Sequence, residues 1–492
     1  MKKIIIITFT LIFAMLSAHS QDESDALRYS QDLPLGTARS ISMSGAFGAL
    51  GGDFSSIRIN PAGLGVYRGS EFTITPGYSY ILGVSDFKNN SFEDFKPSLK
   101  ISNLGFVGHF ASDDEEGWVG ASFAIGYNLI QNYNLSMTIE GINENSSYAD
   151  YFMQWANGYS PDMLDPYYEG LAYDTRIIDN PGGVYETPVL LGEKQKHTIS
   201  SEGTKGEYLF AFGANYNHQL YFGASFTIDK ISYSNTTKHT EEYTNNLANN
   251  YNSFTFTKEY DTEGTGYSFQ FGTLFKPVQF IRLGASVRFP TLYSLEDAYY
   301  NTMENVTDTA TYSAQPYDPQ NDETLDEGVS QYTLSTPFKF TGSAAFIFEK
   351  QGLISIDYDY YNYSKLQLKP DGSGDDFSTV NKEYIEALYQ PTSNIRVGGE
   401  YRIGIFALRG GAGLYQTPYK NAGDFTDGGY TTYSLGFGFR EKGYFVDVGY
   451  MFSNHQEDYA LYDLPDNTNM PDPISNNTTQ KHRFLITLGL RF

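Results

Sequence analysis

The chain has 492 residues, of which 16% are aromatic and 48 are glycine, and it has no cysteine. The 58 acidic residues outnumber the 33 basic ones and give a net charge of −25. This balance excludes nucleic acid as a partner, because binding phosphates requires clustered Lys and Arg. Without cysteine the chain has neither a disulfide scaffold nor thiolate ligands, and it has no His-Glu-x-x-His motif, so we expect no metal site.

Residues 1–20 have the pattern of a secretory signal peptide. Lys2 and Lys3 precede an apolar stretch over residues 4–16, and small residues at Ala18 and Ser20 define a cleavage site. No later segment has eighteen consecutive apolar residues, so the sequence predicts no transmembrane helix. We therefore expect an exported protein that begins near Gln21.

Alternation of apolar with small or polar residues is the main structural pattern. It runs over residues 119–129 and continues in phase to 139, which favours one long strand there. It recurs over residues 208–216, 220–228, 267–275, 281–289 and 484–492. Runs of this length exceed the strands of a soluble sandwich and suit strands that cross a membrane, and no fixed repeat indicates a propeller or β-helix. The pattern predicts an all-β, transmembrane antiparallel β-barrel.

Short and long connections alternate along the predicted barrel. The short ones are residues 111–117, 217–219, 276–279, 349–352, 403–404 and 441–443, and the long polar ones are 82–97, 141–193, 241–251, 304–330, 369–392, 416–429 and 457–479. Outer-membrane barrels have short periplasmic turns and long extracellular loops, so this arrangement predicts about fourteen strands over residues 70–492. Such a barrel is too wide for its own side chains to fill. The glycine-rich residues 21–69 are expected to plug the lumen.

The stretch from Gly36 to Tyr67 resembles the N-terminal hatch of FadL-type outer-membrane transporters, the FadL/TodX family. Asn60, Pro61 and Ala62 match the hatch motif of that family. Further similar pieces are Ser335–Pro337, Asp357–Tyr363, Asn394–Gly398 and Arg409–Gly413. The alternating last strand ends at Phe492 and resembles the sequence that the outer-membrane assembly machinery recognises.

The resemblance implies a monomeric fourteen-stranded barrel in the outer membrane, with an N-terminal hatch. It implies passive uptake of long-chain fatty acids or other hydrophobic small molecules, without a cofactor. In that family the ligand docks in an outer groove, enters a pocket beside the hatch and leaves sideways into outer-membrane lipid at a kinked third strand.

Three groups of residues are candidates for these roles. Helix-forming residues in the segment 141–193 place apolar side chains where an outer groove is expected, although ordinary loop packing also explains them: Phe152, Met153, Trp155, Met163 and Leu164. Gly126 is the candidate for the strand-three kink, or else a small residue facing the lumen. Arg282, Arg288 and Arg396 are candidates for binding a carboxylate, unless they pair with acids of the lumen such as Asp357.

Other functions fit less well. An esterase needs a Ser–His pair held by a third polar group, and the sequence has no Gly-x-Ser-x-Gly elbow, so we expect no enzyme. Haem uptake is an alternative because His can ligate haem, with His197, His239 and His455 as loop candidates. A third alternative is a barrel of this type that acts as a docking partner in protein export.

Overall fold

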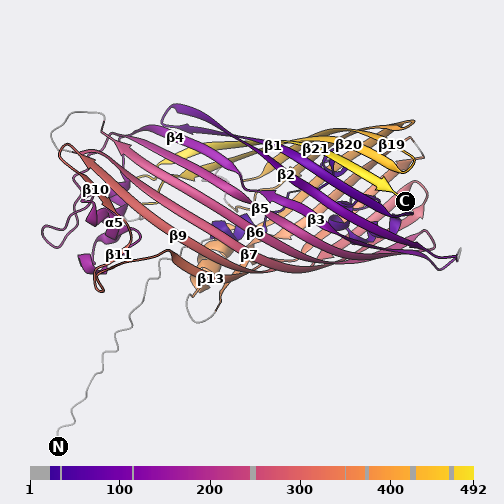
Figure 1. The fold of residues 1–492 in the computed structure, drawn as a ribbon, viewed down its shortest axis with the longest axis horizontal. Coiled ribbons are helices and arrows are strands. Elements are labelled where there is room, and N and C mark those ends of the chain that lie inside the picture. Colours follow the sequence, from indigo (N-terminus) through magenta and orange to yellow (C-terminus); the bar gives the residue numbers. More distant parts are fainter. Residues whose placement is uncertain are drawn as a thin grey trace, which may run out of the picture.

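The computed structural model describes residues 23–33, 36–113, 116–243, 251–349, 351–371, 376–420, 428–464 and 470–492. The expected signal peptide lies outside the described residues. Figure 1 shows one long barrel of tilted strands. Short connections lie at the end marked C, and the long, partly helical loops lie at the opposite end. Among the described residues, no helix has the length and apolarity to span a membrane.

The barrel wall is a closed antiparallel sheet of fourteen strands, some of them interrupted. β1 pairs with β21, which closes the wall. In chain order the wall is β1 (Glu71–Phe87), β2 (Asn90–Ala111), β3 (Trp118–Asn132) with β4 (Leu135–Asn143), β5 (Glu193–Tyr216), β6 (Leu220–Glu242), β7 (Tyr251–Val278), β8 (Ile281–Arg288) with β9 (Leu292–Thr307), β13 (Gly328–Ser335) with β14 (Lys339–Phe348), β15 (Gly352–Asn362) with β16 (Gln367–Pro370), β17 (Pro391–Ile403), β18 (Phe406–Tyr415), β19 (Tyr430–Glu441), β20 (Tyr444–Ala460) and β21 (Ile474–Arg491).

The remaining elements lie at the N-terminus and in the long connections. The N-terminal segment holds α1 (Glu23–Ser30), α2 (Ala38–Ile41), α3 (Ser56–Ile59) and η1 (Pro61–Val66). The long connections hold α4 (Tyr148–Ala156), η2 (Pro161–Met163), α5 (Glu169–Asp174), β10 (Thr311–Ala314), β11 (Tyr317–Asp318), β12 (Glu323–Thr324), η3 (Tyr363–Lys365), η4 (Val380–Ile385) and α6 (Glu386–Leu388).

The alternation in the sequence corresponds to the two faces of the wall. Phe210 and Phe212 on β5 point outward and are exposed, whereas Ala211 between them is buried against the N-terminal segment. The same alternation places an apolar belt around the outside of the barrel, as contact with lipid hydrocarbon requires: Phe123, Ile125, Phe269, Phe271, Ile354, Ile356, Val397, Leu408, Leu435, Val448, Ile486 and Leu488. The predicted barrel class and strand number are confirmed.

Two local predictions are wrong. Residues 82–97 form no long loop, because β1 and β2 continue to a two-residue turn at Lys88 and Asn89, whose positive φ angles of 48° and 67° suit a tight hairpin. The long strand expected over residues 119–139 is interrupted between β3 and β4.

Candidate functional site

The N-terminal segment contacts inward-facing side chains on widely separated strands. The amides of Phe47 and Gly48 each donate a 3.0 Å hydrogen bond to the carboxylate of Asp357 on β15. Arg39 lies 2.9 Å from Glu400 on β17. The amide of Ala38 donates to the hydroxyl of Thr487 on β21 at 2.7 Å. Side chains of the wall thus provide hydrogen-bond partners for backbone amides of this short irregular segment, and buried backbone groups need such partners.

The Asn60-Pro61-Ala62 motif is buried and joins the N-terminal segment to the wall. The Nδ2 group of Asn60 donates to the carbonyl oxygens of Gly48 at 2.8 Å and of Thr273 on β7 at 3.0 Å. Its Oδ1 atom accepts a 3.1 Å hydrogen bond from the amide of Ala62, and so caps η1. Pro61 begins η1, where a missing N–H carries no penalty. One side chain therefore joins three backbone segments.

Glycines of the wall make room for this segment. A Cβ at Gly272 would collide with Asn60, one at Gly223 with Pro61, and one at Gly213 would lie 2.9 Å from Leu64. These three glycines are neighbours across β5, β6 and β7. Further glycines that contact the segment pair across other strands: Gly105 with Gly126, Gly398 with Gly411, and Gly436 with Gly449. The sequence analysis missed this pattern, which appears only once the strands are aligned.

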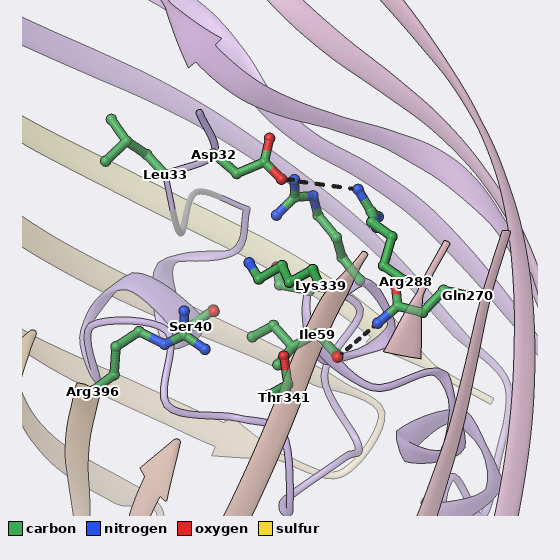
Figure 2. A pocket seen from close by; sticks show the side chains of 11 residues that line it. Asp32, Leu33, Ser40, Ile59, Gln270, Arg288, Lys339, Thr341 and Arg396 are labelled. Atoms are coloured by element: carbon green, nitrogen blue, oxygen red, sulfur yellow. Dashed lines mark hydrogen bonds and ion pairs between the residues drawn. The ribbon is translucent and has the colours of Figure 1, made fainter. Parts of the chain in front are cut away.

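A small polar cavity of about 30 Å³ lies between the N-terminal segment and the wall (Figure 2). The carboxylate of Asp32 forms ion pairs with Arg58 at 2.6 Å and with Lys205 at 3.0 Å. Arg288 and Lys339 line the same cavity, together with Leu33, Ser40, Ser55, Ile59, Gln270, Thr341 and Arg396. Gln270 donates to the carbonyl of Ile59 at 2.8 Å, one of the two interactions drawn in Figure 2. The cavity is bordered by compensated charges rather than by an apolar surface.

Arg288 and Arg396 are held by acids of the lumen. Arg288 lies 2.8 Å from Glu207 on β5, and Arg396 lies 2.7 Å from Asp359 and 3.4 Å from Asp357 on β15. These are the ion pairs named as the alternative in the sequence analysis. Arg282 is placed differently: its Nη1 group donates to the carbonyl of Leu50 at 2.6 Å near the end with short turns. The three arginines therefore do not converge on one site.

The five apolar side chains proposed for an outer groove lie in two environments. Phe152 on α4 is fully buried in a core that α4, α5 and the long connections form at the end opposite the short turns, here called the cap, and Leu164 joins the same core. Met153 packs against this core from its edge. Trp155 and Met163 are instead exposed, by 51% and 47%. Ser147 caps α4 with the reciprocal bonds of a capping box.

The wall is interrupted between β2 and the later part of β3. Ladder pairing of β2 with β3 covers residues 103–111 and 120–128. In the part of the chain that the structure describes, Leu129 and the residues after it pair with β5 but have no ladder partner on the β2-facing side. A register shift lies between Leu129 and Gln131. We call residues 128–134, with the facing edge of β2 from residue 90 to 102, the seam.

The kink expected at Gly126 lies elsewhere. Gly126 sits in regular ladders with Gly105 and Leu209. A Cβ there would collide with the ring of Phe54 and the carbonyl of Leu104, so its role is close contact with the N-terminal segment. The irregularity begins three residues later, at Leu129, where pairing with β2 has ended. This corrects the prediction.

The seam contains buried polar atoms without a hydrogen-bond partner among the described residues. They are on Asn128, Gln131, Asn132, Tyr133 and Asn134. Buried polar atoms are rarely left unpaired, so a group of them indicates a site that water or a ligand occupies. Lys96 on β2 reaches across the seam and lies 2.9 Å from Glu202 and 3.1 Å from the carbonyl of Ser201 on β5, and β4 also packs against β1 and β2.

The histidines considered for haem already have partners. His197 and His239 are buried on β5 and β6, with their Nδ1 atoms 3.2 Å apart. His239 also lies 3.0 Å from Glu241, which accepts hydrogen bonds from Ser147 and from the amide of Tyr148 at the start of α4. This cluster of His197, His239 and Glu241 anchors α4 to the wall.

Comparison with known proteins identifies the fold. No family model and no curated protein matches the sequence. The structure of a FadL homologue from Pseudomonas aeruginosa is 13% identical and superposes with a TM-score of 0.55, over 94% of this chain and 99% of that chain. The P. putida toluene transporter TodX is 12% identical, with a TM-score of 0.53 over 94% and 99%. This chain therefore has the fold of the FadL homologue and TodX, a fourteen-stranded antiparallel barrel.

Proposed function

We propose that this protein carries hydrophobic small molecules across the outer membrane by passive diffusion. The support is its fold, shared with a FadL homologue and a toluene transporter, together with the apolar belt around the wall. Long-chain fatty acids are the first ligands to test, because each buried CH₂ group contributes about 0.8 kcal/mol. Residues 21–69 act as the plug in this proposal.

The observation that carries the proposal is the seam beside β3. The N-terminal segment occupies the lumen with ion pairs and short backbone contacts, so an apolar molecule gains little by crossing it. At the seam, the wall lacks ladder hydrogen bonds, so opening it breaks contacts such as those of Lys96 but no strand pairing. Tyr208 is exposed next to the seam and contacts the half-buried Tyr127, as in an interfacial aromatic girdle. Lateral exit here delivers an apolar molecule to lipid.

Bridging the seam covalently tests this route. The chain has no cysteine, so Lys96→Cys with Glu202→Cys introduces one defined pair, because the native side chains meet across the seam. We expect labelled oleate uptake, in cells lacking their own fatty-acid transporter, to fall to background after treatment with a short bifunctional thiol reagent. With a bifunctional methanethiosulfonate, which forms a disulfide at each cysteine and releases sulfinate, uptake returns when a reductant cleaves the bridge.

The matched control is Glu140→Cys with Lys194→Cys. These residues form a 3.0 Å ion pair of the same type between β4 and β5, which are joined by a regular ladder. The same reagent is expected to leave uptake in this variant unchanged. Equal inhibition of both variants, or full uptake through the bridged seam, contradicts lateral exit. Repeating the assay with labelled toluene separates an aromatic ligand from a fatty acid.

A further inference from the structure

Arginines gather at the end of the barrel that has the short turns. A cavity of about 700 Å³ opens there between the N-terminal segment and the strand ends. Four of its arginines belong to strands and lie close to short turns, and two belong to the N-terminal segment: Arg282, Arg402, Arg440 and Arg491, with Arg39 and Arg68. Short turns are periplasmic in outer-membrane barrels, so this cavity faces the periplasm.

The acids around this cavity do not balance its arginines. Glu400 alone serves Arg39, Arg402 and Arg409, at 2.9, 2.6 and 2.7 Å. Asp447 pairs with Arg409 and Arg440, and Glu71 with Arg491. Glu349 is the one acidic side chain that lines the cavity among the described residues. With Asp53 close to Arg39 and Lys276 close to Arg68 and Arg282 included, seven arginines and one lysine face five acidic side chains, and a carboxylate on Phe492 would still leave an excess of two positive charges.

Two of these arginines have unused hydrogen-bonding capacity. No ion pair holds Arg68 or Arg282 within the described ranges of the chain. The Nε atom of Arg282 is buried without a hydrogen-bond partner, and so is that of Arg440. Buried guanidinium donors are costly when unpaired. The apolar side chains of Leu50, Val66 and Leu353 line the same cavity and lower its local dielectric constant, which strengthens the attraction for an anion.

We propose that this cavity binds a phosphate group presented from the periplasmic side. Guanidinium groups pair with phosphate oxygens through two parallel hydrogen bonds. An excess of two charges matches a phosphate monoester or free phosphate, which carries between one and two charges near neutral pH, better than a singly charged carboxylate. The inference does not depend on the proposed transport of hydrophobic molecules. A soluble phosphate and a lipid headgroup share this chemistry.

Calorimetric titration of inorganic phosphate into the full chain tests the proposal. The protein is held in amine-oxide micelles, which contain no phosphate, and the ionic strength is kept constant. We expect saturable binding that weakens about a hundredfold in Arg68→Gln/Arg282→Gln, because each lost charge-assisted contact costs about tenfold. Absence of saturable binding, or equal affinity in the double variant, overturns the site.

A charge-matched control removes two cations from the opposite end of the barrel. Lys196→Gln/Lys238→Gln changes exposed residues on the extracellular parts of β5 and β6 and is expected to bind phosphate like the unaltered chain. Heat-modifiable migration on a denaturing gel shows that each variant is folded. If the double variant does not fold, Arg68→Gln alone, at an exposed position, gives the same test with a loss of about tenfold.

Competition then identifies the source of the phosphate group. Displacement of inorganic phosphate by glycerol 3-phosphate supports a soluble ligand. Displacement by phosphatidic acid in mixed micelles, at concentrations where glycerol 3-phosphate has no effect, supports a lipid headgroup. Equal displacement by chloride at the same ionic strength overturns the proposal, because it shows general charge screening rather than a phosphate site.

Discussion

The absence of a side chain at Gly272 allows the Asn60-Pro61-Ala62 motif to approach the wall closely. Gly272 lies directly against the amide of Asn60, and the same residue brings Asn60 within reach of the carbonyl of Thr273. The motif therefore depends on residues more than 200 positions away in the sequence. Its conformation is maintained by close contact as much as by its own hydrogen bonds.

Replacing Gly272 by Ala is expected to displace the motif while leaving the barrel intact. The added Cβ collides with Asn60, and overpacking of this kind costs about 1–3 kcal/mol. We expect faster hydrogen exchange over residues 48–66, measured by mass spectrometry, with unchanged heat-modifiable migration. Gly342→Ala is the control, since no atom lies within 4 Å of a Cβ built there. Similar exchange in both variants would show that the glycine contact does not hold the motif.

The stability of helices α4 and α5 in the cap depends on carboxylates that are buried beside them. Glu169 begins α5, and burial together with the nearby Asp165 raises the pKa of Glu169 from 4.5 to about 7. Glu241 contacts the first residues of α4, so both helices begin beside carboxylates with restricted access to water. The stability of the cap is therefore expected to depend on pH.

Raising the pH from about 4.5 to 7 is expected to loosen α5. In this interval, the unfolded cap releases the proton of Glu169 while the folded cap retains it. Each step up in pH therefore favours the unfolded form, and the effect levels off above the folded pKa. Hydrogen exchange of α5, corrected for the intrinsic pH dependence, measures this change. Glu169→Gln should abolish it; a dependence that persists in this variant would assign it to another group.

The sequence indicates some elements clearly and others not at all. Phe210 and Phe212 alternate with buried residues because one face meets lipid, so their strand was predictable. Residues 90–96 begin β2 with Phe92 and Phe95 on opposite faces among polar residues, and no alternation distinguishes such a strand from a loop. The seam and the glycine contacts depend on strand register, which a single sequence does not give. Asn60 was identified through the resemblance to the hatch motif. Its partner Gly272 is recognisable only once the register of the strands is known.

Closure of the whole barrel depends on its last strand. β21 pairs with both β20 and β1, the amide of Phe492 donates a 3.1 Å hydrogen bond to the carbonyl of Ser70, and the amide of Ser70 donates to the carbonyl of Phe492 at 2.9 Å. These closing bonds use the backbone alone. The ring of Phe492 is 74% exposed and stabilises the folded wall little. Its proposed role is recognition by the outer-membrane assembly machinery.

Phe492→Ala is therefore expected to reduce insertion in cells severalfold without destabilising the folded barrel. The purified variant, refolded in detergent, should show the same heat-modifiable migration and the same thermal midpoint within about 2 °C, because a surface change of this kind costs less than about 0.5 kcal/mol. Insertion is measured as the amount in the outer-membrane fraction relative to total synthesis. Phe280→Ala, another exposed aromatic at the end with short turns, is the control and should insert normally. Equal insertion of the two variants would remove the special role of the last residue, whereas a refolding defect in Phe492→Ala alone would place that role in the stability of the closed wall.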